Sequence, residues 1–114
     1  MSNNQNRLSP YRIMWLFVMF DLPVGTKKER DQATKFRQGL LDLGFEMSQF
    51  SVYLKYCPSK EKSEVVSDKV KVKIPIGGKV DILMITDKQF AGMKRFYAKT
   101  EIKSNAKPKQ LHIF

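Results

Sequence analysis

Residues 13–21 read IMWLFVMFD, a run of eight apolar side chains that ends in an aspartate. Side chains alternate between the two faces of a β-strand, so a strand with this sequence is apolar on both faces. In a domain of 114 residues, helices can cover one face of a sheet, but something else must cover the other. A second copy of the chain is the simplest candidate. The run therefore predicts a buried strand and a homodimer that packs sheet to sheet.

A helix is expected soon after this strand. Thr26 and Glu29 have the spacing of a capping box, in which each side chain satisfies a backbone N–H group of the other residue. Gly44 is a suitable stop at the C-terminal end of the helix. The apolar residues between these points follow the helical period: Ala33, Phe36, Leu40 and Leu43.

Residues 46–56 form a further strand region with alternating side chains. One face carries Phe50, Val52 and Leu54. The other face carries Met47, Gln49, Ser51 and Tyr53. We expect this second face to belong to the dimer contact. The pattern fits either one strand or two short strands separated by a kink.

The rest of the chain completes an α+β pattern. Ser59 is the expected N-cap of a helix that must end before Pro75. Residues 80–85 form the next expected strand, and the Thr86–Gln89 pair repeats the capping-box spacing. Residues 93–98 have the composition of another strand. This order predicts an α+β, ferredoxin-like βαββαβ sandwich with an extra C-terminal strand.

Both ends of the chain differ in composition from the expected core, residues 11–98. Residues 1–10 (MSNNQNRLSP) are polar and end in proline, so they predict a flexible N-terminal arm. Residues 99–114 begin as a polar linker and end in the apolar tail LHIF. Leu111 and Ile113 need a covered position, and a strand added to a sheet edge would provide it.

The charge of the chain limits the choice of partner. Twenty-one Lys and Arg face eleven Asp and Glu, which gives a net charge of +10 and a pI near 9.8. Such an excess favours polyanionic partners, because binding releases counterions from phosphates. The alternative is a basic protein whose charge serves only solubility.

Two further features concern the compartment. The longest apolar run is far shorter than the roughly twenty residues of a membrane-spanning helix, so no membrane partner is expected. Cys57 is the single cysteine, which allows no internal disulfide and favours the reducing cytoplasm.

Two groups of basic residues are candidate nucleic-acid contacts. Lys27, Lys28 and Arg30 open the first expected helix, where backbone N–H groups and the helix dipole favour anions. Lys94 and Arg95 stand beside Phe96 and Tyr97, a combination that suits nucleic acid. A solvated helix face and a packed strand would produce the same residues, and these alternatives remain open.

Four stretches, in order, resemble the Cas2 family of CRISPR adaptation proteins. They are YRIMWLFVMFDLP, the basic amphipathic helix, LGFEMSQFSVYLKYCPS and ILMITDKQFAGM. The aromatic first strand, GFEMSQFSVY and ITDKQF most resemble the branch that accompanies the single large RNA-guided effector nuclease. The resemblance covers residues 11–98 and extends to the apolar tail.

The resemblance implies a fold, partners and a site. Members of the family are ferredoxin-like homodimers whose C-terminal segments cross to the partner protomer. They bridge two dimers of the Cas1 integrase, which inserts captured duplex DNA into the CRISPR array beside a repeat. Many are also described as magnesium-dependent endonucleases acting on RNA or DNA. The family motif carries its metal-ligating aspartate at the position of Asp21, which is therefore the candidate catalytic residue and Mg²⁺ ligand, with one copy from each protomer.

Three hypotheses about function follow. The first is a dimeric bridge that tracks the backbone of duplex DNA and holds the integrase. The second is a metal-dependent phosphodiesterase that uses the paired Asp21 carboxylates, since a single carboxylate makes a poor magnesium site. The third is a small RNA-binding domain or an RNA-cleaving toxin of similar fold. For Asp21 itself, the alternative is a turn residue that accepts backbone N–H bonds.

Overall fold

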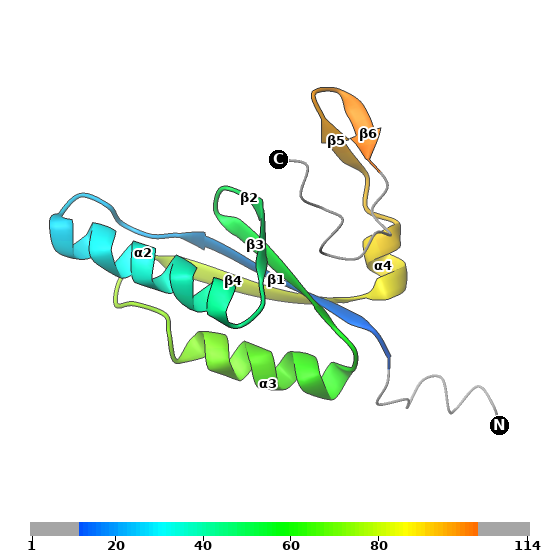
Figure 1. The fold of residues 1–114 in the computed structure, drawn as a ribbon, viewed down its shortest axis with the longest axis horizontal. Helices are drawn as coiled ribbons and strands as arrows, with labels where there is room; N and C mark the ends of the chain where they lie inside the picture. The colour runs from blue at the N-terminus through cyan, green and yellow to red at the C-terminus, as the bar shows by residue number, and fades with distance from the viewer. Residues whose placement is uncertain (1–11, 103–114) are drawn as a thin grey trace.

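The described part of the chain, residues 12–102 of a computed structural model, is built around one four-stranded sheet (Figure 1). In chain order its elements are β1 (Met14–Asp21), α2 (Lys27–Asp42), β2 (Glu46–Gln49), β3 (Val52–Cys57), α3 (Lys60–Lys71), β4 (Lys79–Thr86), α4 (Asp87–Ala91), β5 (Arg95–Tyr97) and β6 (Thr100–Ile102).

The sheet has the strand order β2-β3-β1-β4, and every neighbouring pair is antiparallel. The apolar strand β1 lies in the interior of the sheet, between β3 and β4. Helices α2 and α3 lie on the same face (Figure 1). The order β-α-β-β-α-β confirms the predicted α+β, ferredoxin-like fold. The homodimer stays a prediction.

Local cap chemistry sets the helix boundaries as expected. The Thr26 hydroxyl accepts a bond from the Glu29 N–H at 3.1 Å, and the Glu29 carboxylate accepts one from the Thr26 N–H at 3.0 Å. Thr86 and Gln89 form the same reciprocal pair at the start of α4. Ser59 caps α3. Gly44 follows α2 with a φ of 95°, a conformation that glycine adopts without a steric penalty.

The region 46–56 is a hairpin of two strands, which decides between the two alternatives. A register shift lies between Met47 and Gln49, and residues 50 and 51 turn the chain. Met47 is paired with Tyr53, and Tyr53 packs against the Phe20 ring in the core beneath the helices. Within one chain, α2 and α3 cover this face and leave Tyr53 only 4% exposed, so it is a core residue of the protomer, and its place at a dimer contact stays a prediction.

The other predicted interface residues of this region are distributed over two faces. Met47 is exposed at the edge strand β2, on the helix-covered side with Tyr53. Gln49 is exposed and is paired with Val52, which packs on the opposite face of the sheet. Ser51 lies in the turn, where its carbonyl accepts the Phe20 N–H at 3.1 Å. The register shift separates residues that strict alternation would have kept together.

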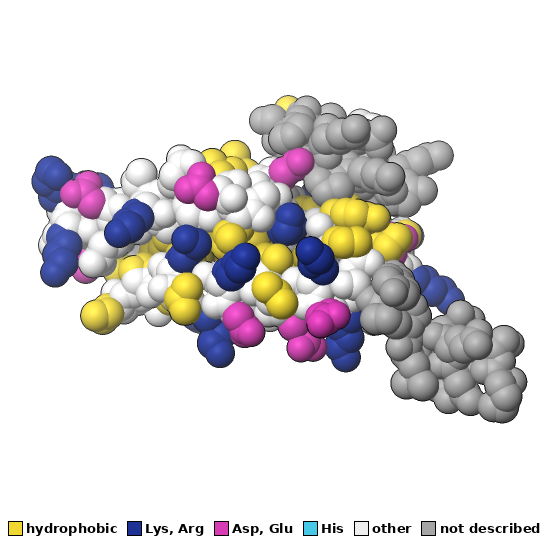
Figure 2. All heavy atoms as spheres, turned by 60° about the horizontal axis from the view of Figure 1, so that its bottom comes forward, with side chains coloured by type: hydrophobic (Ala, Val, Ile, Leu, Met, Phe, Trp, Pro, Cys, Tyr) yellow, Lys and Arg dark blue, Asp and Glu magenta, His cyan; other side chains and the backbone are white. Residues whose placement is uncertain are grey.

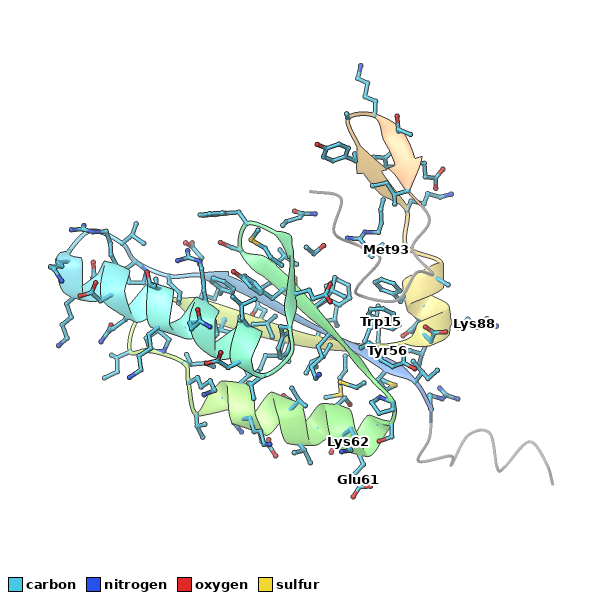
Figure 3. All side chains as sticks on the ribbon, in the orientation of Figure 1. Trp15, Tyr56, Glu61, Lys62, Lys88 and Met93 are labelled. Carbon is cyan, nitrogen blue, oxygen red and sulfur yellow. The ribbon has the colours of Figure 1, made fainter. Side chains whose placement is uncertain are left out.

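The sheet face opposite α2 and α3, called here the helix-free face, is partly covered by the chain itself. Trp15 is fully buried there: it stacks on Phe90 of α4 at 3.8 Å between ring centroids, and its Nε1 donates to Asp87 at 2.8 Å. Figure 3 shows Trp15 and Tyr56 together beside α4, with Met93 nearby. Leu83 of β4 is still 47% exposed, so α4 covers only one end of this face.

A small hairpin follows α4. β5 lies within the strand predicted at 93–98, whereas β6 lies in the stretch that we expected to be a polar linker. The two residues between them, Ala98 and Lys99, have φ values of 51° and 70°. A two-residue turn with positive φ matches the twist of a hairpin, but it usually contains Gly, Asn or Asp. The sequence therefore contains no ordinary signal for this turn.

Some expectations lie outside the described residues. These are the N-terminal arm, the end of the polar linker, and the C-terminal strand with Leu111 and Ile113. Within residues 12–102, the helices are too short or too polar to cross a membrane.

The contact between α4 and β1 yields a test of stability. Phe90→Ala removes a fully buried ring from the Trp15 stack and leaves a cavity. We expect the free energy of unfolding to fall by about 3–5 kcal/mol, measured by urea denaturation. Phe96→Ala, which removes an equal ring from an exposed position of β5, should change it by no more than about 0.5 kcal/mol. Equal destabilisation of both variants would contradict the anchoring role of Phe90.

Candidate nucleic-acid interface and metal-binding aspartate

Asp21 is the last residue of β1 and is exposed on the helix-free side of the sheet. Its place follows from the alternation of side chains along a strand: Trp15 and Phe17 are on that face, and Asp21 is an even number of residues further along. No hydrogen bond or ion pair to its carboxylate comes from residues 12–102. The structure therefore does not give Asp21 the turn-capping bonds of the alternative interpretation. Its oxygens are available to a ligand.

The strand register brings a second carboxylate to the same end of the sheet. Asp21 is opposite Lys79, and Asp81 stands two residues further along β4 on the same face. Diagonal neighbours of this kind lie about 7–8 Å apart. The Lys79 ammonium forms an exposed ion pair with Asp81 at 3.7 Å. The site thus contains two carboxylates, of which only Asp21 is unpaired within the described residues.

This donor set fits Mg²⁺ only in part within one chain. Within residues 12–102 no three of the His, Cys, Asp and Glu side chains come together as a metal site. Magnesium commonly uses one or two protein carboxylates and completes an octahedral shell with water. Asp21 supplies one such ligand. A second Asp21 from another protomer would supply the next.

The backbone around Asp21 is held by a close approach of two loops. Gly78 has a φ of 82°, and a Cβ at this position would lie 2.9 Å from the Asp21 carbonyl oxygen and 2.8 Å from the Leu22 side chain. A residue with a side chain would meet both a strained backbone conformation and a steric clash. The glycine before β4 thereby fixes the end of β1 on which Asp21 lies.

The start of α2 is a basic end of the molecule. Figure 2 shows Lys and Arg gathered at the end where α2 begins, and a further row of them along the helical face. Lys27 and Lys28 are exposed, although Lys27 also pairs with Asp31 at 2.9 Å. Arg30 instead donates to the carbonyls of the 24–25 loop at 3.1 and 3.4 Å. The two lysines are thus exposed to solvent, whereas Arg30 stabilises the loop between β1 and α2.

The second predicted basic group, Lys94 and Arg95, also contains one exposed residue and one that is bonded within the protein. Lys94 is exposed. Arg95 is half-buried, donates to the Ser48 hydroxyl at 2.7 Å, and stands over the Phe90 ring at 5.9 Å. Burial lowers the pKa of the Arg95 guanidinium from its ordinary value. Arg95 joins β5 to β2, so its observed contacts are structural. Strand β5, which directly follows Lys94, lies far from the start of α2 (Figure 1).

Cys57 has no partner for redox or metal chemistry among the described residues. It is a free thiol in the core beneath the helices. Burial raises the pKa of the thiol, while nearby Lys55 acts in the opposite direction. A buried thiol with a raised pKa is a poor nucleophile. A packing role is therefore the better interpretation.

Comparison with known proteins decides the family. The family described as CRISPR associated protein Cas2 matches residues 14–93, from the first residue of β1 to just after α4. The chain belongs to the Cas2 family. This confirms the resemblance seen in the four sequence stretches.

Relatives in the Cas2 family match along nearly the whole chain. A protein of Paracidovorax avenae is 47% identical over 107 residues, covering 94% of this chain and 99% of the relative. A protein of Flavobacterium psychrophilum is 44% identical over 108 residues, covering 95% and 94%. One of Parvibaculum lavamentivorans is 41% identical over 101 residues, covering 89% and 100%. All three are named CRISPR-associated endoribonuclease Cas2.

Sequence reasoning missed two parts of this region. Lys79 and Asp81 join Asp21 only through the register of β1 and β4, and a register between distant strands leaves no local signal. Arg37 lies outside the apolar stripe of α2, yet its guanidinium lies over the rings of Phe20 and Phe50, a contact that the helical period does not predict. The aromatic residue at position 50 was the available signal, since aromatic rings attract cations.

Gly78 provides a test of the loop contact that holds Asp21. Gly78→Ala should lower the free energy of unfolding by about 1–3 kcal/mol, because the new residue keeps a positive φ and its Cβ meets backbone. Gly92→Ala is the matched control, since its φ is −82° and its Cβ would make ordinary contacts. Urea denaturation of both variants checks this. If both variants change the free energy of unfolding by the same small amount, the contact between Gly78 and the end of β1 does not contribute to stability.

Proposed function

We propose that this chain acts in CRISPR adaptation as a dimeric bridge that binds duplex DNA through its phosphates, within the integrase complex. Membership in the Cas2 family supports the proposed process. The exposed lysines at the start of α2 are the observation that carries the DNA contact. We place the protein in the cytoplasm, where its buried free thiol would stay reduced.

Backbone binding follows from the kind of groups that are presented. Lys27 and Lys28 are point charges on flexible stems, and they stand on the first turn of a sixteen-residue helix whose dipole adds positive potential. Such groups neutralise phosphates but do not read base edges. Binding should therefore depend strongly on salt and weakly on sequence.

The dimer would use the part of the helix-free face that α4 leaves open. Leu83 is exposed there, and Met19 is half-buried beside β4. Two copies packed through these faces would bury about 1,600 Å² in total if the contact is of standard size. Asp21 ends the same face, so the dimer would contain one Asp21 from each copy.

The lysines provide the first test. Lys27→Ala with Lys28→Ala should flatten the slope of log affinity against log salt by about 0.9 for each phosphate that is no longer neutralised, or about two units per engaged protomer. Fluorescence anisotropy of a labelled duplex over a salt series measures this. Lys69→Ala with Lys71→Ala removes the same charge from the last turn of α3 and should leave the slope nearly unchanged. Equal slopes in both double variants would contradict the assignment.

Endonuclease activity is the second candidate function. The relatives carry the name endoribonuclease, and Asp21 has a carboxylate without a partner among the described residues. One Asp21 from each protomer would hold the cation, and Lys79 would place positive charge beside the substrate phosphate. A bound Mg²⁺ supplies a Lewis acid for phosphodiester hydrolysis.

Asp21→Asn separates the bridge from the enzyme. The substitution keeps size and shape but removes the charge and most of the metal affinity. We expect the dimer and spacer integration to persist, and any magnesium-dependent cleavage of RNA or DNA to disappear. Both assays should use one preparation, with Mg²⁺ and with chelator, and Asp68→Asn on α3 is the control for a carboxylate away from the site.

Two results would contradict these expectations. If integration fails in Asp21→Asn while the dimer and integrase binding persist, the bridge requires the carboxylate and our division of roles is wrong. If cleavage persists in Asp21→Asn, the activity does not come from this site.

A further inference from the structure

A cation lies between two aromatic rings at the turn between β2 and β3. The Arg37 guanidinium carbon is 5.7 Å from the centroid of the Phe20 ring and 5.3 Å from that of Phe50. Phe20 is in the core, whereas Phe50 is 76% exposed. The three side chains form a stack that runs from the core to solvent, called here the Phe50 stack.

Three elements hold this stack in place. Phe20 belongs to β1, Arg37 to the middle of α2, and Phe50 to the turn. The turn is fixed to β1 by the bond from the Phe20 N–H to the Ser51 carbonyl. Phe20 itself is held edge-on by Phe36 of α2 at 5.2 Å. The exposed ring is thus presented on a rigid support.

Core packing does not explain Phe50. Its ring belongs to neither of the two apolar clusters of the described residues. An aromatic side chain that remains exposed on a turn gains little from folding. Its contact with Arg37 orders one side of the ring and leaves the rest of it to solvent.

The charge of Arg37 is also uncompensated. No carboxylate among residues 12–102 forms an ion pair with it, and its buried Nε has no hydrogen-bond partner there. A protein partner that docked on Phe50 would have to bury this cation. A ligand that carries its own negative charge next to a flat ring would instead satisfy both groups.

We propose that the Phe50 stack is a platform for an unpaired nucleobase of DNA or RNA, with the adjacent phosphate attracted to Arg37. Every base has a flat π face, so stacking on an exposed aromatic ring tolerates any sequence. Bases within a duplex are already stacked and would not engage Phe50. The inference rests on the proposed function only in that the ligand is a nucleic acid.

The test compares single-stranded with duplex ligands. A twelve-nucleotide single strand with 2-aminopurine at its centre reports stacking by a fall in fluorescence. The wild type should quench this probe, and Phe50→Leu should abolish the quenching and weaken single-strand binding about tenfold. Phe50→Tyr keeps a ring and should keep both signals. DNA and RNA versions of the probe identify which nucleic acid supplies the base.

Controls separate stacking from folding and from phosphate binding. Ile76→Ala removes another exposed apolar side chain and should leave quenching unchanged. All variants should unfold at the wild-type urea midpoint, because each changes an exposed residue. Duplex affinity and its salt slope should be the same in Phe50→Leu as in the wild type, because Lys27 and Lys28 carry that contact.

The outcomes of this test are distinct from those of the proposed function. Two results would overturn the platform: Phe50→Leu keeps the quenching and the single-strand affinity of the wild type, or it weakens duplex binding as much as single-strand binding. A protein-docking role for Phe50 would then be the better interpretation. Absence of duplex binding in the wild type would instead contradict the bridge. In that case the single-strand measurements alone would still test whether Phe50 stacks on a base.

Discussion

Strand β1 lies in the interior of the sheet, so both of its hydrogen-bonding edges must be paired and both of its apolar faces must be buried. Its edges are satisfied by β3 and β4 along nearly its whole length. Its helix-side residues form the core with α2 and α3, and Trp15 and Phe17 on the other face pack against Phe90. The two candidate sites are both placed by this strand, because Asp21 ends it and Phe20 supports Arg37.

Local chemistry was the predictable part of the fold. The caps at Thr26, Ser59 and Thr86 each depend on residues within one helical turn, so spacing alone located them. The apolar run of β1 predicted a buried strand for a similar reason. Gln49 was grouped wrongly with Met47 because a register shift interrupts the alternation between these two residues. β6 was missed because its turn, Ala98–Lys99, lacks the usual turn residues.

The candidate site was predictable only as single residues. Asp21 was identified through the family resemblance and is exposed at the end of its strand. The sequence could not distinguish cations presented to solvent from those used internally. Lys27 and Lys28 belong to the first kind, whereas Arg30 and Arg95 are bonded to neighbouring loops and strands. For Arg95 that difference depends on a tertiary contact with a residue far away in the chain.

The small β5–β6 hairpin has a consequence for how the protein fluctuates. Each of its strands has three residues, and among the described residues it pairs with itself and not with the main sheet. A lone two-stranded hairpin is marginal in water, and here the Arg95–Ser48 bond is its observed link to the edge strand β2. The hairpin can therefore open while β1 stays fully paired. In native-state hydrogen exchange, its amides would exchange through local opening, and those in the middle of β1 would exchange only through global unfolding.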